Sequence, residues 1–239
     1  MSDRKPIVSW QNATHSAELT RPFDFGTIDA GDKSNVVTVN IWNNKGGNTD
    51  VATMEECTIT AVDRDGGTGD TIGNIVPSVR DRWFHAQVDS LGEDDLEDES
   101  SRIGRESSKE IGTTGSTLHK TSDSATTWAA STAYNVGDAV KPAVSNGRFY
   151  VCTKAGTSDT TAPTWITDVG DTVYDGTVEW EVKSINNTPA LGEILGIANY
   201  GLAANSAGNF TTISFQIDVP QNADSGRQDA KFRTSFKYV

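Results

Sequence analysis

Four aromatic side chains in the middle of the chain have the chemistry to hold a sugar. They are Trp128, Tyr150, Trp165 and Tyr174, all between residues 125 and 183. A flat ring can stack on the apolar face of a sugar, while nearby Asn, Asp or Thr groups hydrogen-bond the sugar hydroxyls. Trp165 lies in a turn-rich stretch, where burial is harder, so it is our first candidate platform. Tyr174 is the second.

The alternative for the same rings is a structural role. A module of about 60 residues has little core, so a few large aromatic side chains must supply most of its buried apolar area. On this interpretation Trp128, Tyr134, Tyr150 and Trp180 are core residues, and Trp165 is one as well. The sequence leaves both interpretations of Trp165 open.

No arrangement of residues in the sequence predicts catalysis. The three histidines, His15, His85 and His119, lie in unrelated contexts, and we expect His85 on the polar face of a strand. A Ser/His/Asp triad can be assembled on paper from any chain this rich in Ser and Asp, so it carries no weight. The glycine-rich run 66–70 follows a strand but precedes no helical stretch, which indicates a turn and not a phosphate-binding loop. We therefore expect a non-enzymatic protein with no cofactor.

Acidic residues raise one question of metal binding. Residues 93–99 carry six acids in seven positions, which predicts a solvated acidic loop or, alternatively, a Ca²⁺ site, because hard cations take clustered carboxylates. The spacing does not match an EF-hand loop, and Asp63-x-Asp65-Gly66 is a shorter alternative. Cys57 and Cys152 lie far apart, and with three histidines they show no zinc-ligand spacing. A disulfide between them stays open.

The composition excludes several classes of function. The net charge is −13 with a pI near 4.6, whereas a nucleic-acid binder needs a basic face. No apolar stretch approaches the ~18 residues of a membrane span. The N-terminus lacks the apolar region of a signal peptide, so we expect synthesis in the cytosol without export by that route. Hydrophobic residues make up 35% of the chain, and the abundance of Gly, Thr, Ser, Asn and Asp favours many short strands joined by polar turns.

Alternating apolar and polar residues predict a series of such strands. The cleanest pattern is 213–219, with Ile213, Phe215, Ile217 and Val219 on its apolar side. Strands separated by turn signals at this spacing are typical of a β-sandwich, so we predict an all-β fold with an Ig-like or jelly-roll-like sandwich. The predicted strands are 7–10, 23–28, 36–42, 57–63, 83–89, 213–219 and 232–239.

The middle of the chain has a different character. We interpret residues 93 to about 124 as a flexible, exposed loop or linker. An aromatic-rich stretch follows, and its hairpin signals, Asn146-Gly147 and Asp175-Gly176, predict a small inserted module of three to five strands at 125–183. Residues 1–122 and 185–239 would then complete one discontinuous sandwich.

The ordered motifs of the insert resemble a known class of module. Trp128-x5-Tyr134-x2-Gly137-Asp138-x-Val140 is similar to the small chitin-binding-type carbohydrate modules of families 5 and 12. The motifs that follow, Asn-Gly-x-x-Tyr, Ala-Gly-Thr-Ser, Pro-x-Trp and Asp-Gly-Thr-Val-x-Trp, look like the variant found in phage and prophage structural proteins. The resemblance implies a carbohydrate-binding fold. After Pro-x-Trp the chain departs from the chitinase-type pattern.

The flanking pieces resemble, more weakly, structural proteins of tailed phages. The residues behind this are 39–47, 83–92, 217–220 and 233–239. The resemblance implies a non-enzymatic virion surface protein, either a capsid decoration or a tail or baseplate accessory, which displays the insert for host adsorption. The implied partners are other virion structural proteins, further copies of this chain through edge strands, and a cell-surface glycan. The alternatives are a purely structural virion protein and a binding module of a glycan-degrading system.

Overall fold

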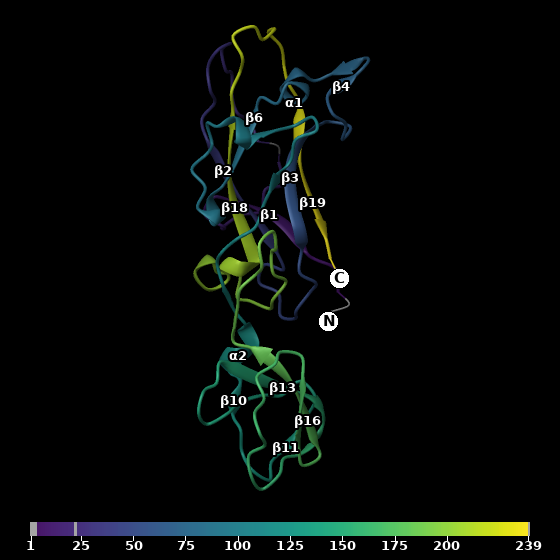
Figure 1. Ribbon diagram of the computed structural model, residues 1–239, viewed down its shortest axis with the longest axis vertical. Helices are drawn as coiled ribbons and strands as arrows, with labels where there is room; N and C mark the ends of the chain where they lie inside the picture. Colours follow the sequence, from purple (N-terminus) through teal and green to yellow (C-terminus); the bar gives the residue numbers. More distant parts are fainter. Residues whose placement is uncertain (1–3, 22, 239) are drawn as a thin grey trace.

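The computed structural model describes residues 4–21 and 23–238, and the all-β prediction is confirmed. Among these residues most elements are short antiparallel strands, with two one-turn helices, α1 (Pro77–Arg80) and α2 (Lys120–Ser124), and four 3₁₀ turns. The molecule is elongated (Figure 1), and one end is formed by the strands of residues 126–184. The other strands are β1 (Val8–Asn12), β2 (Val37–Asn43), β3 (Glu55–Asp63), β4 (Asp70–Thr71), β5 (Asn74–Ile75), β6 (Phe84–Val88), β7 (Arg102–Ile103), β8 (Lys109–Glu110), β9 (Thr117–Leu118), β17 (Asn186–Asn187), β18 (Phe210–Ile217) and β19 (Ala230–Lys237).

We call the described residues outside 126–184 the outer region. Its larger sheet joins strands from both ends of the chain. Its order is β1-β2-β18-β6-β7, and every pair is antiparallel. Successive side chains of a strand point to opposite faces, so Val39 and Ile41 of β2 enter the core with Ile213 and Phe215 of β18. Trp42 lies on the opposite face of β2. The alternation predicted for these two strands is confirmed.

A second sheet, β19-β3-β8, packs against the first. Ile59 of β3 belongs to the same hydrophobic cluster as Ile213 of β18. Phe232 of β19 stacks on Phe215 of β18, with ring centroids 4.0 Å apart and planes at 17°. Two sheets therefore share one core, whereas an Ig-like or jelly-roll topology stays a prediction.

The prediction of a strand at 23–28 is wrong. Phe23 and Phe25 pack against the core, which explains the alternating pattern, but the backbone of the segment joins no sheet. Asp24 turns the chain instead, because its Oδ1 accepts a hydrogen bond from Gly26 N at 2.9 Å. The last strand ends at Lys237, two residues earlier than predicted, and Val239 lies outside the described residues.

The flexible linker predicted for 93–124 is also wrong. Glu93 Oε2 accepts a hydrogen bond from Val88 N at 2.6 Å, and its carboxylate lies 3.0 Å from Lys109 Nζ. Asp95 pairs with the same ammonium group. Further on, Ile111 is fully buried in the core. Glu93 and Asp95 thus hold the start of the acidic run against the outer region. The residues that follow the run pack as part of that region.

Residues 126–184 form a sheet of their own. Its order is β10-β12-β13-β16-β15, and a separate pair, β11-β14, lies beside it. Gly147 and Gly176 have φ of 77° and 59° at the two predicted hairpin turns, a conformation that glycine adopts without strain. The strands are β10 (Thr126–Thr127), β11 (Ala133–Tyr134), β12 (Ala139–Lys141), β13 (Arg148–Lys154), β14 (Gly156–Thr157), β15 (Thr172–Asp175) and β16 (Val178–Ser184). We call residues 126–184 the module. Independent folding of the module stays a prediction.

Buried asparagines tie the chain that returns from the module to the outer region. Asn44 Nδ2 donates to Gly196 O at 2.8 Å, and Asn199 Nδ2 donates to Asn44 O at 2.8 Å. Asn209 Nδ2 donates to Asn43 O at 3.0 Å. These amides satisfy backbone groups that no strand ladder reaches, so residues 194–209, which form no strand and only two 3₁₀ turns, are held against the outer region.

Candidate functional site

The aromatic residues of the module meet around one buried carboxylate, that of Asp175 at the end of β15. Its Oδ2 accepts hydrogen bonds from Trp128 Nε1 at 2.8 Å and from Trp180 Nε1 at 3.1 Å. Its Oδ1 accepts one from Asp159 N at 2.9 Å. Charge-assisted hydrogen bonds of this kind are stronger than neutral ones, so Asp175 fixes both indole rings.

Trp128 and Trp165 form the open side of this cluster. Both side chains are half-buried and pack on the core of the module. Their ring centroids are 6.4 Å apart with planes at 77°, an edge-to-face contact. Trp165 also lies against Tyr150, at 4.4 Å and 48°. The module therefore presents two indoles in a fixed arrangement, each with part of its surface open to solvent.

Tyr150 supports this arrangement from inside. It is fully buried, so its ring has no face open to a ligand. Its hydroxyl donates to Ile166 O at 2.7 Å and accepts from Asn146 Nδ2 at 2.7 Å. The core role predicted for Tyr150 and Trp180 is confirmed, since Trp180 is also fully buried.

Tyr174 lies apart from the other predicted site residues. Its neighbours on β15, Val173 and Asp175, are buried, whereas Tyr174 is 74% exposed on the opposite face. It is opposite Glu179 in the ladder with β16, and Glu179 pairs with Lys154 at 2.7 Å. The structure brings Trp128, Trp165 and Tyr150 together and places Tyr174 on another face.

Asp175 and Asn146 position the aromatic rings of this cluster, a role that the sequence did not indicate. In the sequence both residues belong to hairpin turns, Asp-Gly and Asn-Gly, and the turn signal accounts for them locally. The remaining signal was the spacing of Asp175 and Trp180, which places both side chains on the inner side of one hairpin. That spacing has a meaning only once the hairpin register is known.

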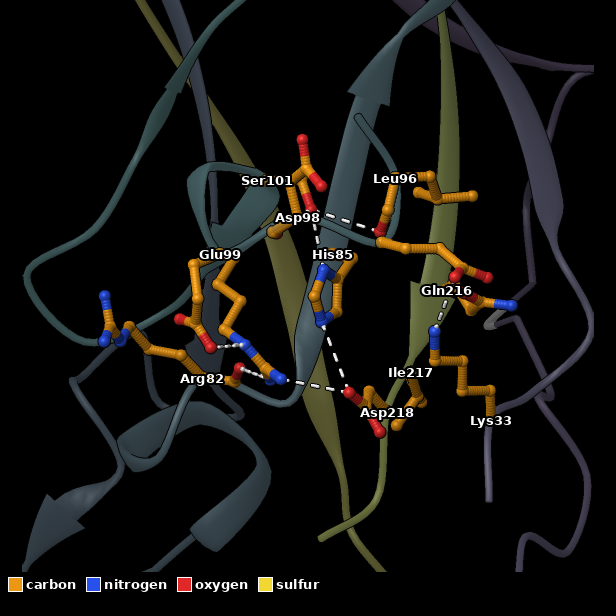
Figure 2. A network of polar contacts seen from close by, with 12 residues as sticks. Lys33, Arg82, His85, Leu96, Asp98, Glu99, Ser101, Gln216, Ile217 and Asp218 are labelled. Atoms are coloured by element: carbon orange, nitrogen blue, oxygen red, sulfur yellow. Dashed lines mark hydrogen bonds and ion pairs between the residues drawn. The ribbon is translucent and has the colours of Figure 1, made fainter. Parts of the chain in front are cut away.

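A second polar cluster lies in the outer region around His85 (Figure 2). His85 Nδ1 lies 2.6 Å from Ser101 Oγ, and His85 Nε2 lies 3.9 Å from Asp218 Oδ2. The guanidinium of Arg102 lies 3.0 Å from the same carboxylate of Asp218 and 2.8 Å from the carboxylate of Glu99. Contrary to the expected position on an exposed polar face, His85 is buried beneath the acidic segment. The residue types are those of a hydrolase triad.

Hydrogen bonding around Ser101 opposes a catalytic role for this cluster. Ser101 Oγ lies 2.8 Å from Asp98 O and 3.1 Å from Leu96 O. Carbonyl oxygens only accept, so the hydroxyl donates to them, and His85 Nδ1 must carry the hydrogen that it donates to Ser101. A nucleophilic serine needs the opposite direction of donation and an exposed oxygen, whereas Ser101 is fully buried.

Burial and the nearby Arg102 guanidinium lower the pKa of His85, and they outweigh the opposite effect of Asp218. The neutral imidazole that results agrees with the bare Nε2, which is buried and has no hydrogen-bond partner among the described residues. The cluster fastens residues 96–102 over β6. It does not assemble an acid and a base.

The other histidines serve separate contacts. His15 Nδ1 accepts a hydrogen bond from Trp42 Nε1 at 3.1 Å. His119 Nε2 lies 3.0 Å from Asp50 Oδ1, and its ring packs on Phe149 of the module at 4.8 Å. The three histidines therefore do not converge.

The carboxylate of Asp63 binds the backbone of the loop that follows β3. Asp63 accepts hydrogen bonds from Asp65 N at 2.9 Å, Gly67 N at 2.8 Å and Gly69 N at 3.2 Å. Together these hydrogen bonds lower the pKa of Asp63, and the bond from Gly67 N has the largest effect. The amides that would cradle a phosphate are thus already occupied. Among residues 4–21 and 23–238, no group of three His, Cys, Asp or Glu is arranged to hold a metal ion.

The two cysteines are free thiols in different hydrophobic clusters. Cys57 belongs to the core of the outer region and Cys152 to that of the module. Burial raises the pKa of Cys57 to about 12, so this thiol is unreactive at neutral pH.

Comparison with known proteins found no relative of this chain. No family model, no curated protein and no solved structure matches the chain. The resemblance of the module and of the flanking pieces therefore rests on their motif residues. Among the described residues, no helix has the length and apolar character required to cross a membrane.

Proposed function

We propose that this protein is a non-enzymatic surface component of a bacteriophage-type particle, anchored by its outer region, which displays the module for contact with a cell-surface glycan. The observation that carries the proposal is the pair of half-buried indoles, Trp128 and Trp165, held edge to face at the surface of the module. The motif resemblance supports the same conclusion from the sequence.

Rigidity is the physical reason to favour ligand binding at these rings. Trp128 is held through its Nε1 by Asp175, and Trp165 is held through its ring by Tyr150. A ring that is already oriented loses little conformational entropy when a ligand stacks on it. Polar groups that can bond sugar hydroxyls flank Trp165 in sequence, since Thr164 and Thr167 are both exposed.

Weak binding at one module is compatible with this function. Many copies on one particle raise the avidity for a surface without new contacts. The outer region would supply that multiplicity through its neighbours in the particle. The position of the module at one end of an elongated molecule (Figure 1) suits display.

The test uses the full chain on an array of bacterial cell-wall and capsule glycans that includes N-acetylglucosamine oligomers. The variants are Trp165→Ala and, as a matched control, Tyr174→Ala, which removes an exposed ring from the other face. We expect binding to fall by about tenfold or more, or about 1.4 kcal/mol, in Trp165→Ala and to persist in Tyr174→Ala. Thermal unfolding of each variant separates loss of a contact from loss of the fold.

Two results would contradict parts of this proposal. Absence of binding in the unmodified chain would favour a purely structural role for the module. Loss of binding in Tyr174→Ala alone would move the site to the other face. For the particle, deletion of residues 125–183 should leave assembly intact and reduce adsorption, and imaging of assembled particles would report whether the protein belongs to the capsid or the tail.

A further inference from the structure

The strand β19 leaves one edge of the second sheet open. It is eight residues long and, within residues 4–21 and 23–238, its backbone pairs only with β3. One edge strand of the first sheet, β1, is partly covered, because Leu19 N donates to Trp10 O at 2.8 Å and Asn12 N donates to Ala17 O at 2.9 Å. The free edge of β19, at the flank of the molecule (Figure 1), is therefore the more available of the two.

An apolar hollow runs along this free edge. Its volume is about 530 Å³. Its apolar lining comes from β1, β3 and β19, through Val8, Trp10, Val62, Phe232 and Phe236, and Lys231, Arg233 and Thr234 of β19 also border it. Both phenylalanines point toward the core but are only half-buried. Thr234, between them on the same face, has a buried Oγ1 without a hydrogen-bond partner among the described residues. The two sheets thus leave space for a further strand at this side.

The outward face of β19 carries positive charge in an acidic protein. Lys231, Arg233 and Lys237 alternate with the inward residues and are exposed, whereas the whole chain has a net charge of −13. Lys237 pairs with Glu56, but Lys231 and Arg233 have no ion-pair partner among the described residues. Two cations beside a free edge favour a partner with carboxylates at the facing positions.

The same cations disfavour pairing between two copies of β19. A second β19 would bring its own Lys and Arg row against this one, and like charges across neighbouring strands are destabilising. Charged residues on an edge strand also protect it from unwanted pairing. Protection does not, however, account for an apolar hollow of this size beside the strand.

We propose that the free edge of β19 is a docking site for an extended segment of another protein, which adds a strand to the sheet. Residues of that segment that face inward are apolar and fill the hollow beside Trp10, Phe232 and Phe236. Residues that face outward are acidic and lie beside Lys231 and Arg233. Main-chain hydrogen bonds give affinity in this mode of recognition, and alternate side chains give specificity. The site lies on the outer region, so it is independent of sugar binding by the module.

The test measures binding of two labelled seven-residue peptides to the full chain by fluorescence anisotropy. One peptide alternates valine with glutamate, and the other alternates valine with lysine. We expect the acidic peptide to bind at least about tenfold more tightly, and we expect the double variant Lys231→Glu/Arg233→Glu to reverse the preference. The matched control, Lys154→Glu/Arg227→Glu, changes two exposed cations elsewhere and should behave like the unmodified chain.

Amide hydrogen exchange then locates the peptide. Binding should slow exchange in residues 230–237 and leave the module unchanged. The proposal is overturned by equal affinity for the two peptides, by no binding at about 1 mM, by binding that survives the double charge reversal, or by protection confined to other strands. Self-association of the unmodified chain through β19, detected by sedimentation and abolished by the acidic peptide, would also overturn it in favour of a second copy as the occupant.

Discussion

The outer region and the module stabilise themselves with different side chains. Among the described residues, the main hydrophobic cluster of the outer region contains sixteen buried residues, of which Phe84 and Phe215 are aromatic, while Trp42, Trp83 and Phe210 are buried elsewhere in the region. The core of the module contains eight, of which Tyr134, Tyr150 and Trp180 are aromatic. A small unit buries a smaller fraction of its surface, so each side chain in it must cover more area. The difference shows how chain length decides which residue types form a core.

Large polar aromatics bring a second requirement. An indole N–H or a phenol O–H that is buried needs a partner, because an unsatisfied buried group costs about 1–3 kcal/mol. Asp175 meets this need for Trp128 and Trp180, and Ile166 O meets it for Tyr150. The sixteen-residue cluster of the outer region contains no indole or phenol and needs no such partners. Outside that cluster, Trp42 is buried on the other face of β2 and meets the same need through His15 Nδ1. The module places three polar aromatic rings in a core of eight residues, so each of them contributes a larger share of its stability.

The largest expected effect is that of Trp180→Ala. The change leaves a cavity in the core of the module, which lowers the free energy of unfolding by about 3–5 kcal/mol. This is as much stability as a core of this size commonly supplies. We expect the module to unfold while the outer region stays folded. Residue-resolved amide exchange should show lost protection in residues 133–184 and retained protection in β2, β3 and β18.

Ile213→Ala is the matched change in the outer region. It costs about 2–5 kcal/mol, but a core of this larger size leaves the region folded at 25 °C, so only its midpoint in urea should fall. If Trp180→Ala removed protection from both regions, the chain would be one cooperative unit. The division into module and outer region would then be wrong.

A smaller effect is expected when Asp175 is replaced by alanine. The change leaves the indole N–H groups of Trp128 and Trp180 without their acceptor, at a cost of about 2–3 kcal/mol. Unfolding of the module in urea should shift accordingly, whereas the exposed control Asp168→Ala should stay within about 0.5 kcal/mol of the unmodified chain. Equal stability of the two variants would show that packing, not the carboxylate, holds the rings.

Features set by local chemistry could be predicted from the sequence. The turns at Asn146-Gly147 and Asp175-Gly176 follow from glycine at positive φ, and the alternation of β18 follows from a strand with one face in the core. The aromatic core of the module followed from its size. In each case, neighbouring residues contain the whole signal.

Features set by distant contacts could not be predicted. The acidic run appeared solvated because nothing near it in sequence shows that Lys109 pairs with Glu93 and Asp95. Phe23 and Phe25 alternate like strand residues, yet no partner strand lies beside them. For Asp175, a turn explained the residue completely until the register of β15 and β16 brought two indoles to its carboxylate.

The smallest expected effect is a loss of stability of the outer region at acidic pH. All three histidines lie outside the module. Burial, then Arg102, lowers the pKa of His85 in the folded chain, and burial, then Lys45, lowers that of His15. Below the usual pKa near 6.5, the unfolded chain therefore binds protons that the folded chain does not. Stability is full above about pH 6.5 and is lost as the pH falls toward the folded pKa values.

The outer region should therefore weaken between about pH 6.5 and pH 5. Urea unfolding of the outer region at several pH values, followed by exchange in β6 and β18, measures the slope. His85→Asn retains an N–H donor near Ser101 and removes the titration, so its slope should be smaller, with the remainder due to His15. An unchanged slope in His85→Asn would mean that the pKa of His85 is the same in the folded and unfolded chain, so that burial and Arg102 do not lower it. A steeper slope in His85→Asn would mean that Asp218 raises the pKa of the imidazole and keeps it protonated.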